Sequence, residues 1–346
     1  MPRKQRLSNI ELLRILSMVM ILVVHIDGAS LGQPAPSGDL SSLTGRQVWQ
    51  LAVESFSIIG VNLFTLISGY FGIRLSVKSA SSFLFQCLFY AVGIATVAPL
   101  FLHGHFSWTQ WGDSWLILTH TDLWYVPCYF LLMLLSPALN AGLKALNLRQ
   151  CLVTTGLFAA YTLWVGWWWG KSFNPTGYTI MQLILVYMIG HCISRIPALT
   201  QPSRRRSVIS LVAYLITTAA VFLSALYLPP LKAFAYNSPL VMAASVALFL
   251  CFRAMKFQSP AINYIAKSSF AVYLLHKNPL IWVSLMRPTV VDLWRSTTLL
   301  EFSLLAVAAV IAIYLISMII DALRRALFRP ILQLINQPQP INERSQ

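Results

Sequence analysis

Long apolar runs alternate with short polar or basic segments over most of the chain. Runs of about 17 to 25 largely apolar residues have the length of a helix that crosses a bilayer. We expect ten spans, at 10–26, 53–73, 79–101, 123–143, 151–169, 179–196, 208–228, 239–252, 262–285 and 298–320. The pattern therefore predicts an all-α, polytopic transmembrane helix bundle.

Composition supports a membrane protein. Of the 346 residues, 57 % are hydrophobic and 10 % are charged, against the usual share of about 25 % charged residues in soluble domains. A net charge of +15 would favour nucleic-acid binding in a soluble chain. Here the basic residues punctuate apolar runs, so we expect contact with membrane lipids and no nucleic acid. The apolar pattern contains no evident repeat or long polar linker, which favours one domain over residues 1–346.

The basic residues of the connecting segments predict the orientation, because the side that keeps Lys and Arg is usually cytoplasmic. One side has five: Arg46, Lys171, Lys232, Arg287 and Arg295. The other has sixteen: Arg3, Lys4, Arg6, Arg74, Lys78, Lys144, Arg149, Arg195, Arg204, Arg205, Arg206, Arg253, Lys256, Arg324, Arg325 and Arg329. We therefore expect both termini in the cytoplasm, as an even number of spans requires.

Two features of the chain have simple interpretations. The five cysteines each lie in or beside a different apolar run without CxxC spacing, so we expect core residues and no disulfide framework. The N-terminus resembles a signal peptide in outline. We expect it to remain as a mature helix, because Arg14 interrupts its apolar core and His25 precedes the small-residue patch.

The first apolar run carries three ionisable residues, Glu11, Arg14 and His25. At 100° per residue, the eleven steps from Arg14 to His25 come within about 20° of three full turns, so both side chains lie on one face about 16 Å apart. Intramembrane charges are costly and usually functional. The alternative is an Arg that extends to the headgroups and a His that only hydrogen-bonds a neighbouring helix.

Three other stretches place polar groups near membrane depth. The second run ends with small residues and the hydroxyls of Ser68 and Tyr70. The fourth opens with Asp122, Trp124 and Tyr125, and the ninth places Tyr273 and His276 on one helical face. A packed aromatic with a satisfied hydroxyl is the alternative for either tyrosine. We expect His276 to share a polar cavity with His25.

The segment 102–122 combines His103, His105, Asp113, His120 and Asp122 with three tryptophans. The spacing of its histidines is weak evidence for zinc, so we expect no metal site. Aromatic and acidic side chains also suit sugar hydroxyls. We therefore expect a structural or acceptor-facing loop on the outer side.

The sequence resembles the acyltransferase-3 family of integral-membrane acyltransferases, which commonly O-acetylate bacterial surface glycans. The resemblance rests on 9-NIELLR-14 followed after ten residues by His25, on 64-FTLISGY-70, on 123-LWY-125 and on 269-SFAVYLLH-276. It implies ten spans, a cytoplasmic acyl-CoA donor, an acceptor hydroxyl on the outer side, His25 as the essential histidine and Arg14 as a donor-binding residue. Glu11 stands close to where many members carry Asp, and no appended soluble domain is implied.

The chemistry supplies roles for these residues. A hydroxyl attacks a thioester slowly unless a base takes its proton, and we expect His25 to be that base. His276 or Tyr273 could stabilise the charge that develops on the thioester oxygen. Arg14 and the cluster Arg204, Arg205 and Arg206 could contact CoA phosphates, although topology marking is the alternative for that cluster. For substrate contact we also select Glu11, Ser68, Tyr70, Asp122, Trp124 and Tyr125.

The sequence thus predicts a multi-pass protein of the bacterial inner membrane. It would transfer an acyl group, most simply acetyl, to a surface or lipid-linked glycan, with acyl-CoA as co-substrate and no bound cofactor. A transporter or flippase for a polysaccharide or lipid-linked intermediate would also bury Arg and His beside a water-filled path. A transporter often shows internal repeats and matching broken helices, and we find neither in the sequence.

Overall fold

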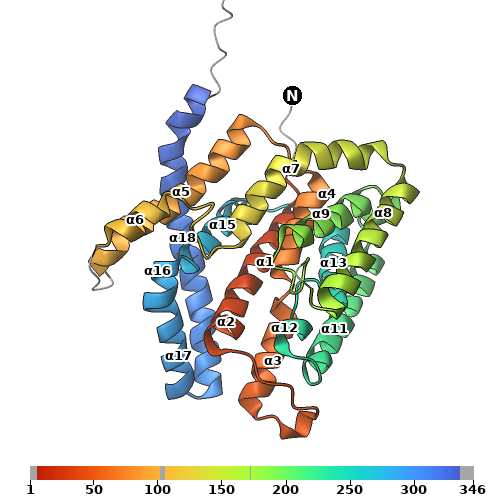
Figure 1. Ribbon diagram of the computed structural model, residues 1–346, viewed down its shortest axis with the longest axis horizontal. Coiled ribbons are helices and arrows are strands. Elements are labelled where there is room, and N and C mark those ends of the chain that lie inside the picture. The colour runs from red at the N-terminus through yellow and green to blue at the C-terminus, as the bar shows by residue number, and fades with distance from the viewer. Residues whose placement is uncertain (1–5, 102–105, 172, 336–346) are drawn as a thin grey trace, which may run out of the picture.

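The computed structural model describes residues 6–101, 106–171 and 173–335. Within these ranges the chain forms helices and no strand, so the predicted all-α class is confirmed. Figure 1 shows a bundle whose helices run at different tilts rather than in parallel. The first turns of α1 and the last turns of α18 lie at the same end of the molecule in this view.

The longer helices are α1 (Ser8–Ile26), α3 (Gly45–Ser57), α4 (Gly60–Phe71), α5 (Val77–Phe101), α7 (Tyr125–Ala145), α8 (Leu148–Tyr161), α9 (Ile180–Ser194), α11 (Arg204–Ala225), α13 (Pro239–Ala254), α17 (Arg287–Ser296) and α18 (Leu299–Ile335). Shorter ones are α2 (Gly28–Leu31), α6 (Trp108–Ser114), α10 (Pro197–Thr200), α12 (Pro230–Ala233), α14 (Pro260–Ile265), α15 (Ser269–His276) and α16 (Pro279–Ile281). Segments of π-helix cover Thr162–Trp168 and Trp282–Met286, and 3₁₀ turns cover Leu40–Ser42 and Ala266–Ser268.

Seven helical segments of the described chain are long and apolar enough to cross a membrane. They are Ser8–Leu31, Gly45–Phe71, Val77–Phe101, Tyr125–Ala145, Leu148–Trp168, Arg204–Ala225 and Leu299–Pro330. The predicted spans 179–196 and 239–252 correspond to α9 and α13, which have 15 and 16 residues. These are shorter than the roughly 17 to 25 residues that a span needs. A multi-pass membrane protein is therefore supported, while ten spans remain a prediction.

Two predicted spans are interrupted in the structure. Residues 53–73 fall in α3 and α4, which are separate helices on either side of Ile58 and Ile59. Residues 262–285 are divided among α14, a 3₁₀ turn, α15, α16 and a π-helix. A proline begins both α14 and α16, where its missing N–H costs least. Apolar run length did not reveal these breaks.

Small residues let α1, α4 and α9 approach closely, as the sequence predicted for the second run. A Cβ added to Gly69 would lie 2.1 Å from the backbone oxygen of Tyr187, and one added to Gly190 would lie 2.5 Å from the oxygen of Leu66. On the other side of α4, a Cβ at Gly60 would lie 2.7 Å from the oxygen of Ser17. Only glycine fits at these three crossings without backbone movement.

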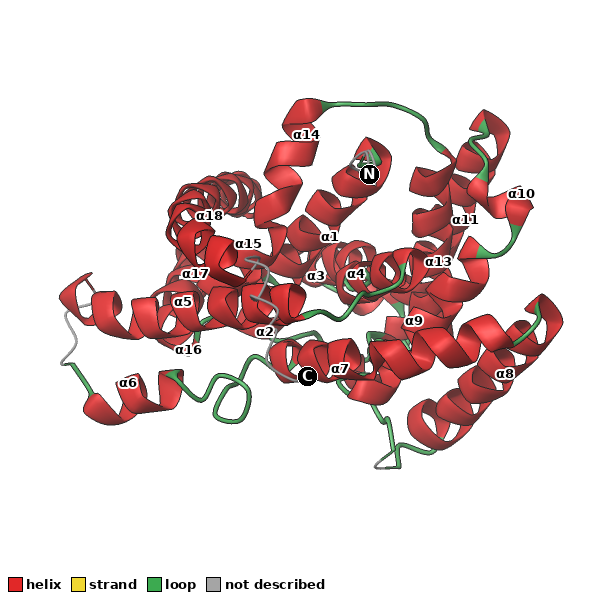
Figure 2. Cartoon of the chain, turned by 90° about the horizontal axis from the view of Figure 1, so that it is seen from above, coloured by secondary structure: helices red, strands yellow, loops and turns green. Residues whose placement is uncertain are grey.

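Helix α1 lies inside the bundle, where it packs against α3, α4, α13, α14 and α15 (Figure 2). Its first turn is held by side-chain hydrogen bonds rather than by a capping residue. Ser8 Oγ donates to Asn263 Oδ1 at 2.9 Å, and Asn9 Nδ2 donates to the backbone oxygens of Phe252 and Met255 at 2.9 Å each. These bonds fix the position of α1 relative to α14 and to the C-terminal end of α13.

An ion-pair cluster joins α18 to α15. Asp321 is fully buried, and its carboxylate accepts from Arg324 Nε at 2.7 Å and from Ser268 Oγ at 2.9 Å. Arg325 also donates to this carboxylate. From the sequence, both arginines were expected only to mark the cytoplasmic side. The structure shows that both also donate to the buried carboxylate of Asp321.

All five cysteines are free. Four are buried, as expected of core residues, and Cys128 is half-buried.

Candidate active site

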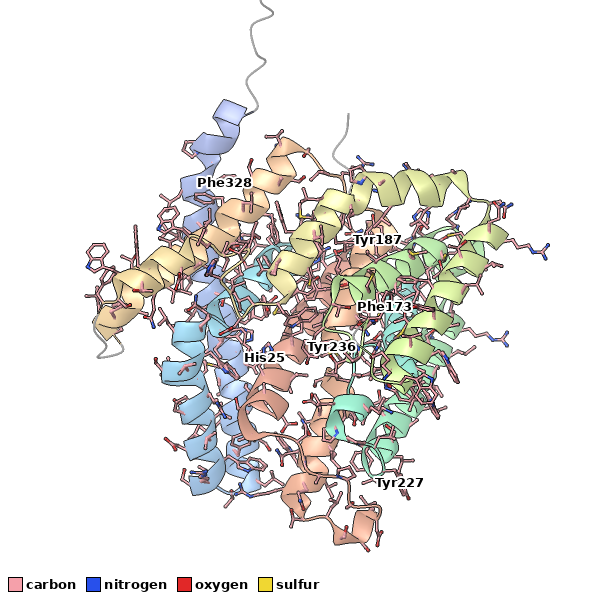
Figure 3. All side chains as sticks on the ribbon, in the orientation of Figure 1. His25, Phe173, Tyr187, Tyr227, Tyr236 and Phe328 are labelled. Carbon is pink, nitrogen blue, oxygen red and sulfur yellow. The ribbon has the colours of Figure 1, made fainter. Side chains whose placement is uncertain are left out.

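His25 lies in the last turn of α1 and makes direct contact with His276 at the end of α15. His25 Nδ1 and His276 Nε2 are 2.8 Å apart, which is a hydrogen bond between the rings. The two histidines therefore lie together as expected, but His276 does not line the cavity beside His25, so the predicted shared polar cavity is not what the structure shows. Figure 3 shows His25 in the interior of the bundle, close to Tyr236 in that view.

The second nitrogen of His276 determines which atoms carry protons. His276 Nδ1 lies 2.6 Å from the backbone oxygen of Val272, and a carbonyl oxygen can only accept. Nδ1 of His276 is therefore the donor, and in the neutral ring Nε2 is an acceptor. His25 must then donate through Nδ1, which leaves the lone pair of its Nε2 available. This tautomer is the one that a general base at His25 needs.

A small cavity of about 30 Å³ lies beside His25, and it has room for roughly one water molecule. Its walls come from five parts of the fold, namely α1, α4, α7, α15 and the segment between α12 and α13. The lining residues are Met18, Ile21, His25, Val61, Phe64, Trp124, Tyr125, Tyr236, Phe270 and Tyr273. Most of these side chains are apolar or aromatic, so the cavity can exclude bulk water from a reaction at His25.

Aromatic rings surround the imidazole of His25. The ring of Tyr273 is nearly parallel to it with centroids 6.4 Å apart, and Trp282 presents an edge at 5.8 Å. Tyr273 and Trp282 are 6 % and 9 % exposed. Across the cavity, Trp124 stacks on Tyr236 with centroids 5.9 Å apart. These rigid side chains restrict the positions that the His25 ring can adopt.

Arg14 occupies the other end of the same face of α1. Met18 and Ile21 follow at intervals of four and three residues and line the His25 cavity, so one face carries Arg14, Met18, Ile21 and His25. Arg14 Nε lies 3.7 Å from a Glu11 oxygen, and its side chain remains 36 % exposed. A guanidinium thus lies at one end of the face and an imidazole at the other, and both residues are half-buried.

The other predicted site residues separate into two groups. Trp124 and Tyr125 line the cavity with Tyr273, whereas Ser68 and Tyr70 lie farther along α4 than the cavity wall. Ser68 Oγ donates to the Phe64 oxygen at 3.0 Å, and Tyr70 accepts from Arg253 Nε at 2.6 Å. Packing roles account for both hydroxyls.

Three further expectations concern residues away from the cavity. Asp122 lines a separate cleft rather than the wall beside His25. Arg204, Arg205 and Arg206 begin α11, which packs against α13, α3 and α12, and none of them lines the cavity. In the loop 102–122, His103 and His105 lie outside the described residues, and His120 bonds Thr119 Oγ1 at 2.9 Å. No grouping of three potential metal ligands occurs among the residues described.

The hydrogen bonds of His276 do not fit its expected role, which was to stabilise the charge on the thioester oxygen. Both of its ring nitrogens are used, one by Val272 and one by His25, so neither is available to a thioester oxygen. A role as oxyanion donor does not fit this arrangement. His276 instead fits a positioning residue that orients His25, as a hydrogen-bonded partner orients a histidine in other sites.

Sequence reasoning missed Tyr236, Phe270 and Trp282. Tyr236 comes from a loop and is placed there by Asn62 and Gln182, which each donate to its backbone oxygen at 2.9 Å. No local sequence pattern predicts that this loop residue contacts the site. Phe270 could have been predicted from the sequence, because it lies three residues before Tyr273 and so on the same helical face.

Two buried carboxyl groups close to His25 were also missed. Asp27 follows α1 and is fully buried, and Glu54 of α3 is 4 % exposed. Gln33 Nε2 donates to Asp27 Oδ2 at 3.4 Å, while Asp27 Oδ1 and Glu54 Oε2 have no partner within the described structure. Asp27 directly follows the predicted span 10–26, so the sequence indicated only that the span ends there.

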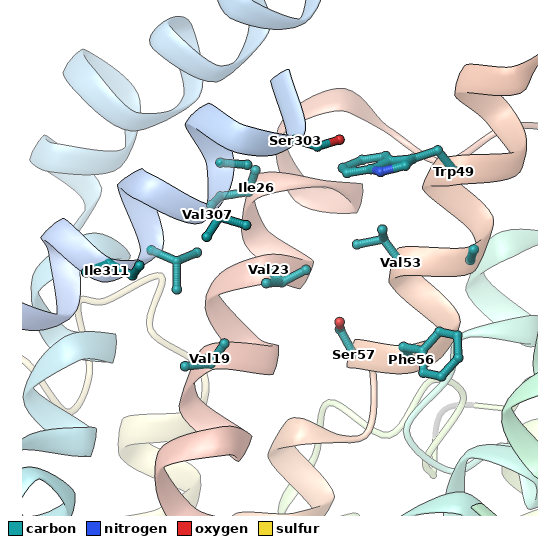
Figure 4. A pocket seen from close by; sticks show the side chains of 13 residues that line it. Val19, Val23, Ile26, Trp49, Val53, Phe56, Ser57, Ser303, Val307 and Ile311 are labelled. Atoms are coloured by element: carbon teal, nitrogen blue, oxygen red, sulfur yellow. The ribbon is translucent and has the colours of Figure 1, made fainter. Parts of the chain in front are cut away.

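A hollow larger than the cavity beside His25 lies elsewhere in the described part of the molecule. An apolar groove of about 610 Å³ separates α1, α3 and α18, with Val23, Val53 and Val307 among its walls (Figure 4). Its lining includes no titratable side chain. Val19, Val23 and Ile26 line it from a face of α1 that differs from the face of His25. The groove therefore has no part in proton transfer.

Comparison with known families places the chain in one of them. A family model described as an acyltransferase domain matches residues 7–318, which is nearly the whole chain. No curated protein and no solved structure matched the chain. The matched range contains α1, the His25 and His276 pair and every residue of the cavity. The chain therefore belongs to the acyltransferase-3 family and is a membrane acyltransferase.

Proposed function

We propose that this acyltransferase moves an acyl group, most simply acetyl, from cytoplasmic acyl-CoA to a hydroxyl of a surface or lipid-linked glycan on the outer side of the bacterial inner membrane. The observation that carries the proposal is the hydrogen-bonded chain from His25 Nδ1 through His276 to the Val272 oxygen, from which we infer that the Nε2 lone pair of His25 is free. A base with this geometry suits the activation of a hydroxyl.

The reaction divides into steps that these residues can perform. The acceptor oxygen attacks the thioester carbon while its proton passes to His25 Nε2, which typically speeds such steps about 10²- to 10⁴-fold. The C–S bond then breaks, and the proton is transferred from His25 to the departing sulfur. Tyr273 lines the cavity and is our candidate donor to the developing oxyanion.

The face of α1 supports a path for the donor. Arg14 suits a CoA phosphate because its guanidinium is planar and always charged. From Arg14 to His25 is about 16 Å along the helix, and an extended pantetheine arm would have to cover this distance to bring the thioester to the base. Met18 and Ile21 lie between the two residues and give the arm an apolar wall.

The orientation in the membrane is part of the proposal. Sixteen basic residues lie in the predicted connecting segments on the same side as the two termini, which favours a cytoplasmic location for both termini. The common location of the start of α1 and the end of α18 supports an even number of crossings. In this orientation Arg14 is on the donor side, and His25 faces the acceptor side.

The test uses purified protein in lipid with acetyl-CoA and an envelope glycan extract, and it measures free thiol and ester-linked acetyl. Wild-type protein should release thiol only when glycan is present, and His25→Ala should lower the rate by about 10²-fold or more. Full transfer by His25→Ala in well-folded protein would refute the base assignment. A glycan that crosses the membrane without being acylated would favour the transporter alternative.

A further inference from the structure

A cleft of about 240 Å³ with several polar side chains in its walls lies next to the site but outside the cavity of His25. Its walls come from α5, from α6 and the turn after it, and from the start of α16. The polar side chains in it are Gln110, Asp113, Ser114, His120, Thr121, Asp122 and Asn278.

The cleft and the cavity share chain segments. Asp122 of the cleft is followed within three residues by Trp124 and Tyr125 of the cavity, and Asn278 comes two residues after His276. Consecutive Cα atoms are about 3.8 Å apart, so these pairs cannot be far from each other. A molecule in the cleft is thereby held close to the end of α1 that carries His25.

Helix α6 presents one face to the cleft. Gln110, Asp113, Ser114 and Ile117 recur at three- and four-residue intervals and all line it. Trp108, Trp111 and Trp115 lie on the opposite face, at about 100° per residue. Trp111 Nε1 fixes this arrangement by donating to Thr96 Oγ1 of α5 at 3.1 Å. The contact of Trp111 with α5 therefore helps to orient the polar face, while Trp108 and Trp115 remain exposed.

Several groups in the cleft are available for a ligand. Among the described residues, the side chains of Gln110 and Asp113 make no hydrogen bond to protein. Asn278 Oδ1 accepts from the Leu280 N–H at 3.1 Å, which fixes the amide while its own N–H groups remain free. Amide and carboxylate groups in one cleft offer both donors and acceptors, as sugar hydroxyls require.

Charge and size narrow the class of ligand. Two carboxylates line the cleft, and no Lys or Arg does. The ammonium of nearby Lys277 lies over the Trp282 ring, 3.7 Å from its centroid. Such a lining disfavours an anionic ligand. The volume is below the roughly 300 to 1,000 Å³ of sites for drug-sized molecules, so it suits one sugar ring rather than an oligosaccharide.

We propose that this cleft binds one neutral or amino sugar unit of the acceptor glycan and holds its hydroxyl toward His25. This inference rests on the proposed function and adds the recognition site and the charge class of the acceptor. Gln110, Asp113 and Asn278 bind the sugar hydroxyls, while the rest of the glycan extends out of the cleft.

The first experiment compares the double variant Gln110→Ala/Asp113→Asn with Thr109→Ala, an exposed position of α6 that does not line the cleft. Base-labile acetate is measured on the envelope glycans of cells that depend on each variant, at matched membrane levels. The double variant should lose about tenfold or more of the acetate, since hydrogen bonds to the sugar are removed, and Thr109→Ala should lose none. Wild-type acetylation by the double variant overturns the inference.

Donor binding separates this inference from the proposed function. The double variant should bind acetyl-CoA as tightly as wild-type protein, because neither Arg14 nor any other residue of α1 lines the cleft. If wild-type protein neither binds acetyl-CoA nor adds acetate to glycans, the proposed function fails. If it does both and the double variant matches it, only the cleft assignment fails.

A second experiment tests charge selection with soluble sugars as competitors. Membranes transfer labelled acetyl from acetyl-CoA to envelope glycan in the presence of p-nitrophenyl β-glucoside or p-nitrophenyl β-glucuronide. The glucoside should inhibit at a concentration about tenfold lower than the glucuronide. Asp113→Lys should narrow this gap, whereas Thr109→Lys should not. Equal or stronger inhibition of the wild-type reaction by the glucuronide contradicts the inference.

Discussion

Replacement of His276 gives the sharpest test of the arrangement at His25. Its ring accepts from His25 Nδ1 at 2.8 Å and is 1 % exposed. A neutral hydrogen bond contributes about 0.5 to 1.5 kcal/mol, which corresponds to roughly 2- to 10-fold in rate. His276→Ala also frees the His25 ring to rotate and to change tautomer. We therefore expect a loss of about 10- to 100-fold, smaller than the loss for His25→Ala.

Glutamine should be tolerated at His276 but not at His25. In His276→Gln the amide oxygen can still accept from His25 Nδ1, so this variant should keep most of the activity that His276→Ala loses. His25→Gln should be almost inactive, since an amide cannot take a proton at neutral pH. His276→Lys offers no acceptor and should resemble His276→Ala. The comparison requires kcat and acceptor KM for each variant at equal membrane level.

The expected change is in kcat, with little change in acceptor KM, because His276 touches His25 and not the substrate. Wild-type kcat should also fall as pH drops through the titration of His25, whose imidazole is useful only when neutral. Two results would refute this reasoning. One is an inactive His276→Gln variant in well-folded protein. The other is a larger loss of activity in His276→Ala than in His25→Ala, which would mean that the base is on α15 and not on α1.

Three other predictions follow from the fold and the face of α1. Arg14→Lys keeps the charge but loses the planar fork, so acyl-CoA KM should rise with partial activity kept; unchanged kinetics of Arg14→Ala would remove this residue from the site. Gly69→Ala should lower the apparent Tm in detergent, since overpacking costs about 1 to 3 kcal/mol and its Cβ would meet a backbone oxygen at 2.1 Å. The matched control Gly93→Ala has open space around its Cβ and should leave the Tm unchanged or higher; equal losses would contradict the packing argument. Reporter fusions after Gln346 and within residues 102–122 should report cytoplasmic and outer locations respectively, and an outer C-terminus would refute the orientation.

The sequence was most informative where a single helix decides the outcome. The spacing of Arg14 and His25 needed only helical periodicity, and α1 runs unbroken from Ser8 to Ile26. Close packing at Gly69 could likewise be predicted, because small residues in an apolar run favour helix contacts. These inferences use neighbours along one element, so no tertiary information was needed.

Breaks within apolar runs could not be predicted from hydropathy. The run 262–285 remains apolar on average, yet α15 has only eight residues. Its flanking turns are stabilised by tertiary contacts, such as the buried hydrogen bond of Ser268 to Asp321, 53 positions along the chain. Window averages of hydrophobicity carry no record of such contacts, and for this reason they did not reveal that the helix is interrupted there.

The functional pairing was predicted in outline but not in detail. A shared site for His25 and His276 followed from their depth in two runs, whereas the direction of their hydrogen bond required the Val272 carbonyl. That carbonyl belongs to the turn of α15 immediately before His276, so the proton arrangement is a product of backbone geometry. Trp282 and Tyr236 complete the surroundings from segments that no motif marks.

The location of the base on a well-packed helix has a mechanistic consequence. His25 Nε2 can act only if the ring keeps one tautomer and one orientation, and a short hydrogen bond, a stacked tyrosine and the edge of a tryptophan all limit its movement. The same packing leaves space for roughly one water molecule at the base, too little for a thioester and a sugar together. Substrate entry must therefore displace side chains of the cavity wall.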